Sequence, residues 1–173
     1  YNEIDDQFAL VQMMLSKERI KVEAIYPAPF SMNERSDHPG KGMELSYDEI
    51  LRCLERINIS HEGLVHKGVT EYIGAKKEFI NAPAVDDLIN RANAGSKENP
   101  LYVIAIGAIS NVSSALLKAP EIKDKIVVVD RGDCYFSNKS YAATVAGAKL
   151  IIVINQDNGS GDWEDGILSL IHI

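Results

Sequence analysis

The sequence predicts an α/β fold with a mostly parallel sheet and helices on both faces. Two continuous apolar runs, residues 101–106 and 126–129, are typical of strands that are buried in a parallel sheet. Segments with helical spacing of apolar residues alternate with these runs, which is the pattern of strands joined by crossover helices. In such sheets, ligands bind beyond the carboxyl ends of the strands.

The chain opens with a helix, a strand and a loop. Apolar residues at helical spacing follow Asp5 and Asp6 and predict a helix over residues 6–16. Residues 22–26 are expected to form a short strand that ends at the prolines after it. Residues 31–42 are polar with Pro and Gly, and we expect a loop there.

Two helices and a strand are expected next. Helical spacing returns over residues 46–57, where Ser46 and Glu49 have the spacing of a capping box. Residues 64–68 are expected to form a strand. Residues 85–94 are expected to form a helix with acidic residues in its first turn.

The second half repeats strand and helix. A helix over residues 110–117 is expected after the apolar run 101–106, and residues 126–129 are expected to form another buried strand. Residues 137–146 are expected to be helical and to lead into the strand 150–154.

Composition excludes several classes of protein. The chain has 173 residues, which suits about one domain, and its charge of −7 argues against a surface that binds nucleic acid. No apolar run approaches the length of about 20 residues that spans a membrane. Cys53 and Cys134 are too few for a disulfide framework, and this favours an intracellular protein.

Both ends of the chain suggest a fragment. The chain starts at Tyr1, directly before the acidic doublet, and it does not begin with Met. Residues 168–173 (LSLIHI) resemble the translation of a transposon-end sequencing adapter, and we expect this stretch to be a scar. The alternative is a natural amphipathic tail.

The acidic doublet Asp5–Asp6 has two explanations. Adjacent carboxylates repel each other, so a divalent cation such as calcium or magnesium would justify the pair. Helix capping and the helix dipole, which stabilise acidic residues by about 1 kcal/mol, explain the pair without a metal, and the spacing alone favours this explanation. The spacing of the two residues leaves both explanations open.

Three motifs in order resemble the nucleoside hydrolase family. Residues 2–10 (NEIDDQFAL) are similar to its acidic signature, and residues 29–50 are similar to the loop and helix after its second strand. Residues 102–116 are similar to its Gly-Pro-Leu-Thr-Asn turn, with Ala108 and Ser110 in place of Pro and Thr. The resemblance covers residues 1–129 and implies a truncated α/β fold of that family.

The resemblance implies calcium-dependent cleavage of the N-glycosidic bond of a ribonucleoside. In this chemistry a metal-held water attacks an oxocarbenium-like sugar. By motif position, Asp6 would ligate Ca²⁺, and Ser110 would offer its backbone carbonyl to the metal. The catalytic base and acid of the family have no counterpart in this chain, so no catalytic residue is assigned and we expect the fragment to be inactive.

The same resemblance implies the substrate contacts. Asp5 would bind a ribose hydroxyl, and Asn33 would contact the ribose. Asn2 and Glu3 would line the sugar site, although they are equally well explained as solvated loop residues. The implied partner is a small-molecule nucleoside in purine or pyrimidine salvage, with no nucleic acid or membrane, and the implied location is the cytoplasm.

Residues 130–156 resemble a different family, the protease-associated (PA) domain. Eight residues fit its core pattern: Arg131, Gly132, Cys134, Phe136, Lys139, Gly147, Ala148 and Asn155. The resemblance covers residues 124–160 and implies a partial β-α-β segment, in which Cys134 is a core or disulfide thiol and not a nucleophile. PA domains bind peptides or shape access to an adjoining site, mainly in secreted or endomembrane proteins.

The two resemblances meet inside one strand. Both families have a strand like residues 123–129, which favours a chimeric join there, and the alternative is a single divergent domain. The expected parts are residues 1–129, residues 124–160 and the scar 168–173. The two functional hypotheses are a calcium-dependent nucleoside hydrolase fragment and a peptide-binding PA module without catalysis.

Overall fold

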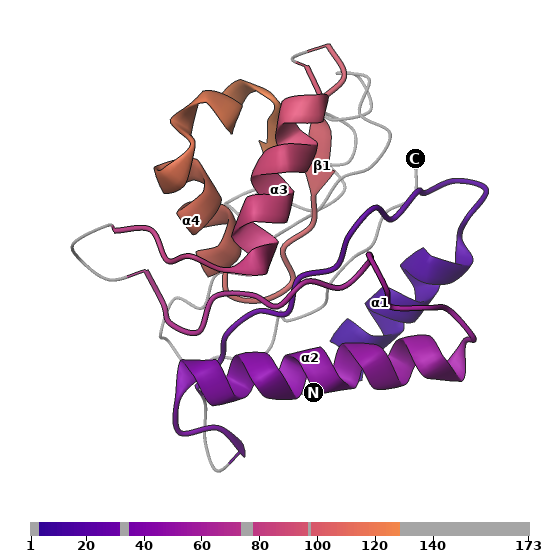
Figure 1. Cartoon of the computed structure of the whole chain (residues 1–173). Helices are drawn as coiled ribbons and strands as arrows, with labels where there is room; N and C mark the ends of the chain where they lie inside the picture. The colour runs from indigo at the N-terminus through magenta and orange to yellow at the C-terminus, as the bar shows by residue number, and fades with distance from the viewer. Residues whose placement is uncertain (1–3, 32–34, 74–77, 97, 129–173) are drawn as a thin grey trace, which may run out of the picture.

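The computed structural model describes residues 4–31, 35–73, 78–96 and 98–128 (Figure 1). Its helices are α1 (Ile4–Leu15), α2 (Pro39–Arg56), α3 (Pro83–Ala94), α4 (Ser110–Lys118) and the 3₁₀ helix η2 (Pro120–Asp124). Its strands are β1 (Leu101–Val103) and β2 (Ile126–Val128). No helix in these ranges is long and apolar enough to cross a membrane.

The strands that the structure describes pair in parallel. β1 pairs with β2 in the register Leu101↔Ile126, and α4 with η2 forms the crossover between them. A single parallel bridge joins Ile25 to Val65. Parallel pairing is what an α/β fold requires. The fold class of the whole chain stays a prediction, because the strand expected at residues 150–154 lies outside the described ranges.

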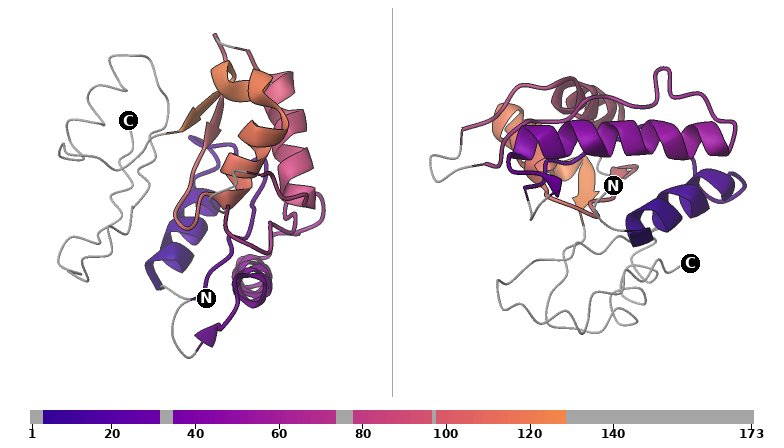
Figure 2. Two further views of the ribbon diagram at one scale, coloured as in Figure 1. Left: turned by 90° about the vertical axis from the view of Figure 1, so that its left-hand side faces the viewer. Right: turned by 90° about the horizontal axis from the view of Figure 1, so that it is seen from below.

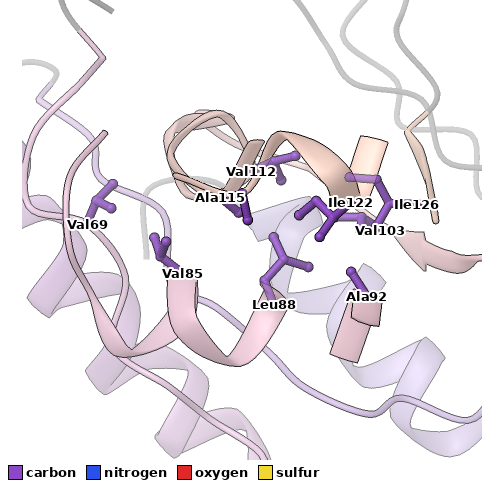
Figure 3. Close-up of a cluster of buried hydrophobic side chains, with 10 residues drawn as sticks. Val69, Val85, Leu88, Ala92, Val103, Val112, Ala115, Ile122 and Ile126 are labelled. Atoms are coloured by element: carbon purple, nitrogen blue, oxygen red, sulfur yellow. The ribbon is translucent and has the colours of Figure 1, made fainter. Parts of the chain in front are cut away.

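The larger core lies between the two strands and the helices α3 and α4, which Figure 2 shows together on one side of the strand pair. Leu88 of α3 and Ile122 of η2 are almost completely buried in it, beside Val103 of β1 (Figure 3). The α3 helix thus covers one face of the parallel pair with an apolar stripe. Burial of such side chains contributes about 1.5–3 kcal/mol each.

A second core joins α1 to α2. Leu10 and Met14 of α1 pack with Cys53 and Leu54 of α2. Phe8, on another face of α1, is 70% exposed. Only one side of α1 is therefore covered by the residues that the structure describes.

The α2 helix starts earlier than the sequence predicts. The expected start at Ser46 and the expected loop over residues 39–42 are wrong, because His38 caps the helix through Nδ1, which accepts a hydrogen bond of 3.1 Å from the amide of Gly40. Pro39 occupies the first turn, where proline is tolerated. A Cβ on Gly42 would lie 1.9 Å from the carbonyl oxygen of Phe30, so glycine permits this close packing. Glu49, the other half of the expected capping box, is buried and accepts a hydrogen bond from Arg52.

The remaining elements agree with the sequence to different degrees. The helices expected at residues 6–16, 85–94 and 110–117 are confirmed within a few residues. The strand expected at residues 126–129 is confirmed as β2. The strands expected at residues 22–26 and 64–68 are reduced to the bridge between Ile25 and Val65. Within the described residues, the pairing of the run 101–106 covers Leu101–Val103, opposite Ile126–Val128.

Candidate functional site

A cavity of about 580 Å³ lies between two extended stretches of the chain. One wall is formed by residues 19–28, and the other by residues 99–109, which include β1. Leu10 of α1 and Ile50 of α2 also line the cavity. The cavity thus contacts both cores and runs along the strand that follows α3.

The lining is mainly apolar. Along the β1 wall, Val103 and Ala105 are buried, whereas Ile104 and Ile106 are only half-buried. This alternation shows that one side of the wall packs on the core with α3 and α4 while the other side keeps accessible apolar surface. The sequence predicted a strand buried on both faces here, and this is wrong for Ile104 and Ile106.

The side chain of Asn111 holds the walls together at one end. Its Nδ2 donates to the carbonyl oxygen of Pro27 at 3.0 Å, and its Oδ1 accepts from the amide of Val69 at 2.8 Å. Gly68 lies in the same place, where a Cβ would stand 2.1 Å from the carbonyl oxygen of Pro27. Because this end is hydrogen-bonded and tightly packed, it fixes the spacing of the two walls.

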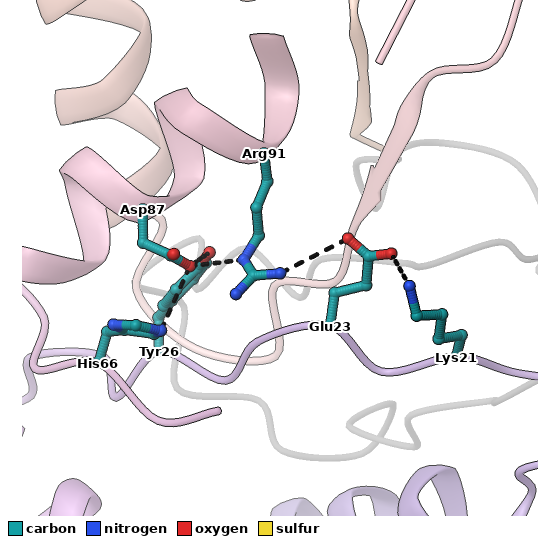
Figure 4. A network of polar contacts seen from close by, with 6 residues as sticks. All are labelled: Lys21, Glu23, Tyr26, His66, Asp87 and Arg91. Atoms are coloured by element: carbon teal, nitrogen blue, oxygen red, sulfur yellow. Dashed lines mark hydrogen bonds and ion pairs between the residues drawn. The ribbon is translucent and has the colours of Figure 1, made fainter. Parts of the chain in front are cut away.

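A polar network lies along the wall formed by residues 19–28 (Figure 4). The Tyr26 hydroxyl donates to Oδ2 of Asp87 at 2.7 Å, and Nε of Arg91 donates to the same oxygen at 2.6 Å. Arg91 also lies 3.6 Å from a carboxylate oxygen of Glu23, and Lys21 donates to the other at 2.8 Å. The two cations and two carboxylates of this network therefore neutralise each other.

The network changes the acidity of its members. Burial alone would raise the pKa of Asp87, but hydrogen bonds from Arg91 and Tyr26 outweigh it, and the pKa is lowered. Burial and the hydrogen bond to Asp87 raise the pKa of Tyr26. Nε2 of His66 is buried without a hydrogen bond, 3.5 Å from Oδ2 of Asp87. At neutral pH the network thus holds an ionised Asp87 and a neutral Tyr26.

Of the predicted site residues, the structure brings Asp6 to the cavity. Asp6 lines it from α1, and Ala108 lines it from the loop after β1. Ser110 is 5% exposed and begins α4, directly after that loop. Asp5 lies in α1, and its side chain is not among the described ones. Asn2, Glu3 and Asn33 lie outside the described residues.

The described residues do not by themselves form a calcium site. Calcium takes about six to eight oxygen ligands. Within residues 4–31, 35–73, 78–96 and 98–128, no three or more His, Cys, Asp or Glu side chains gather as metal ligands. The roles of Asp6 and Ser110 in holding calcium stay predictions.

Cys53 is a core residue, as its position on the apolar side of its helix predicts. It is buried, and its Sγ lies 3.8 Å from Oε1 of Glu49. Burial and the Glu49 carboxylate raise the pKa of the thiol, which keeps it protonated and unreactive. Cys134 lies outside the described residues.

Sequence reasoning missed Asn111 and Gly68. Asn111 stands at the Asn of the Gly-Pro-Leu-Thr-Asn-like motif in residues 102–116, and that motif was the available signal. The partners of Asn111 are distant in sequence, so no local pattern could name them.

Comparison with known proteins finds one family. The family model of the PA domain matches residues 80–170, which is more than half of the chain. The match starts well before residue 124, where the sequence resemblance was expected to begin, and takes in all of α3, β1, α4 and β2. No curated protein and no solved structure matches the chain significantly.

Proposed function

Because this chain belongs to the PA domain family, we propose that it is a non-catalytic module that binds a protein segment or peptide. PA domains bind peptides or shape access to an adjoining site, and the matched residues contribute β1 and the loop after it to the cavity. The family also favours a secreted or endomembrane location, which we propose together with the function.

The apolar cavity between residues 19–28 and 99–109 is the observation that carries this proposal. Ile104 and Ile106 offer accessible apolar surface in it, and Leu10 and Ile50 extend that surface toward α1 and α2. Apolar cavities with a few polar groups are the usual binding sites of proteins. Since the lining is mainly apolar and Lys21 and Arg91 are paired with carboxylates, an uncharged apolar ligand suits the cavity better than a phosphate.

Fluorescence anisotropy with the full chain tests the proposal. The probes are a labelled apolar peptide and a labelled polar peptide of equal length. We expect saturable binding of the apolar peptide that Ile104→Asp weakens at least about tenfold, because a carboxylate in the cavity must be desolvated when the peptide binds. Leu117→Asp is the matched control, since Leu117 is 38% exposed on α4 and does not line the cavity.

Two results would contradict this function. One is that the folded chain does not bind the apolar peptide, so that adding the peptide leaves the thermal unfolding midpoint of the chain unchanged. The other is equal weakening by Ile104→Asp and Leu117→Asp, which would mean that the peptide adheres to apolar surface in general.

Nucleoside hydrolysis is a second candidate, favoured by one observation. Asp6 and Ala108, which belong to two of the motifs that resemble nucleoside hydrolases, line the same cavity. Calorimetric titration of the full chain with calcium chloride tests the metal site that this function needs. The candidate requires heat of binding that Asp6→Asn abolishes, and binding that persists in Asp6→Asn would exclude the assigned role of Asp6.

A further inference from the structure

The turn after α2 presents an asparagine that the candidate peptide site does not use. Asn58 is exposed and lies two positions after the last residue of α2. Its triplet, Asn58-Ile59-Ser60, has the Asn-x-Ser pattern that accepts an N-linked glycan when x is not proline. Because this pattern is short and common, the structure around each triplet decides whether a folded chain can carry a glycan there.

The C-terminal cap of α2 uses only the backbone of Asn58. The amide of Asn58 donates to the carbonyl of Glu55 at 3.0 Å, and the amide of Ile59 donates to the carbonyl of Leu54 at 3.0 Å. With a φ of 55° at Asn58, these two bonds form the left-handed cap that commonly ends a helix. Asparagine adopts this conformation more readily than most residues do, and its side chain takes no part in the two bonds.

The neighbours of Asn58 turn its side chain outward. Ile57 and Ile59, on either side of it, are half-buried and pack against the core between α1 and α2. Ser60 is exposed, and its Oγ accepts from the amide of exposed Glu62 at 3.2 Å. The acceptor asparagine and the serine of the triplet therefore both lie on the solvent side of a polar turn, where a bulky sugar has room.

A second triplet with the same pattern has the opposite surroundings. Residues 111–113 (NVS) lie in the first turn of α4, and Asn111 is 5% exposed. Its Nδ2, the atom that would carry the sugar, donates to the carbonyl oxygen of Pro27 and lies only 2.9 Å from the ideal Cβ position of Gly68. No sugar fits there. Of these two triplets, the fold thus accepts a glycan at Asn58 and excludes one at Asn111.

We propose that Asn58 is an N-glycosylation site. The inference rests on the secreted or endomembrane location proposed above, because this modification belongs to such proteins. The donor is an oligosaccharide joined to a lipid pyrophosphate, and an oligosaccharyltransferase catalyses the transfer. Nδ2 of Asn58 forms a bond to C1 of the first sugar and gives up one proton to a base of the transferase. The bond from C1 to the pyrophosphate oxygen breaks, and the lipid pyrophosphate leaves with its electron pair.

A glycan at this position lies away from the candidate peptide site. None of the described residues 54–63 lines the cavity. We therefore expect the chain to bind the apolar peptide with the same affinity whether Asn58 carries a glycan or not. This independence allows the modification and the peptide-binding function to be tested separately on one sample.

The test uses the full chain, secreted from cultured insect cells behind a cleavable signal peptide. An amidase releases the glycans in water labelled with heavy oxygen, which converts each glycosylated asparagine into labelled aspartate, and mass spectrometry maps the peptides. Mapping is needed because Asn138 and Asn158 begin two further triplets, outside the described residues. A parallel series carries Ser113→Ala, which removes the triplet at Asn111 but keeps its side chain, so that a glycan added there before folding cannot trap the chain.

We expect label at Asn58 and none at Asn111 in the folded, secreted chain. Ser60→Thr should keep the label, because threonine serves the same pattern, whereas Ser60→Ala should abolish it. Asn58→Gly should abolish it as well and is the control for folding, since glycine suits the left-handed cap. Produced in bacteria, Asn58→Gly should unfold within about 2 °C of the unaltered chain.

Unlabelled Asn58 in a folded, secreted chain would overturn the proposal, and so would label at Asn58 that survives Ser60→Ala. Chain that stays in the membrane fraction is mapped in the same way and judged by the same criterion. Fluorescence anisotropy with the apolar peptide is measured on the same samples. Peptide binding without label at Asn58 would overturn the glycosylation site alone, and label without peptide binding would overturn the peptide-binding function alone.

Discussion

Asn111 and Pro27 are joined by a hydrogen bond of 3.0 Å, although 84 residues separate them in sequence. The same side chain accepts from the amide of Val69 at 2.8 Å, so one asparagine of α4 ties together two distant extended segments. Asn111 is 5% exposed, so its bonds are sheltered from water. This arrangement holds one end of the candidate site together.

Asn111→Ala is therefore expected to lower the free energy of unfolding by about 2–4 kcal/mol, because it leaves a buried amide and a buried carbonyl without partners. Urea denaturation at neutral pH measures the change. The control is Asn93→Ala, which removes only an exposed contact with Lys125 and should cost less than about 0.5 kcal/mol. Similar losses in both variants would show that Asn111 does not hold the walls.

Gly68→Ala tests the close approach beside the same asparagine. The added Cβ would stand 2.1 Å from the Pro27 carbonyl oxygen, so the backbone must shift, and we expect a loss of about 1–3 kcal/mol. Gly63→Asn is the comparison, because Gly63 has open space around it and a φ of 69°, which Asn tolerates. A thermal midpoint that falls more for Gly63→Asn than for Gly68→Ala would refute the packing described.

The Asp87 network predicts a pH dependence of stability. The pKa of Asp87 is lowered in the folded state, so its carboxylate contributes stability above the ordinary pKa of aspartate, and this contribution is lost as the pH falls through the folded-state value. The difference in unfolding free energy between the unaltered chain and Asp87→Asn should shrink from about pH 6 to about pH 3. Denaturation by urea across this range measures it, with exposed Asp124→Asn as the control. A constant difference would contradict the ionised network.

Leu54→Ala tests the core between α1 and α2. Leu54 is completely buried, and its truncation should cost about 2–5 kcal/mol through lost burial and the cavity it leaves. Leu15→Ala is the matched control, since Leu15 is 58% exposed on α1. Chemical denaturation measures the free energy of unfolding of both variants. An equal loss in Leu54→Ala and Leu15→Ala would mean that α1 and α2 do not form this core.

Cys53 should react slowly with thiol reagents while the chain is folded. It is buried and the pKa of its thiol is raised, so little thiolate is exposed to the reagent. In a Cys134→Ser background, release of the chromophore from a disulfide reagent should become rapid only when urea unfolds the chain. Fast reaction of the native variant would show that Cys53 is accessible.

Local patterns predicted many elements but not the candidate site. Apolar spacing located the helices that became α3 and α4, and the run 126–129 located β2. The start of α2 was missed because it depends on His38 as a cap and on Gly42 packing against Phe30, and the second of these is not a local pattern. Of the predicted site residues, Asp6 was singled out by motif position and lines the cavity, whereas the walls opposite it depend on distant segments that no local pattern pairs.

By itself, the sequence determined where the main helices and β2 form, because the period of apolar residues and the positions of Pro and Gly act within a few residues of chain. Only the tertiary structure decided that Asn111 binds Pro27 and Val69, that Leu101 pairs with Ile126, and that Ala24 and Ile104 line one cavity. These features depend on which distant segments lie side by side. A pattern of residue types specifies the face that a segment buries, but not the partner that it buries against.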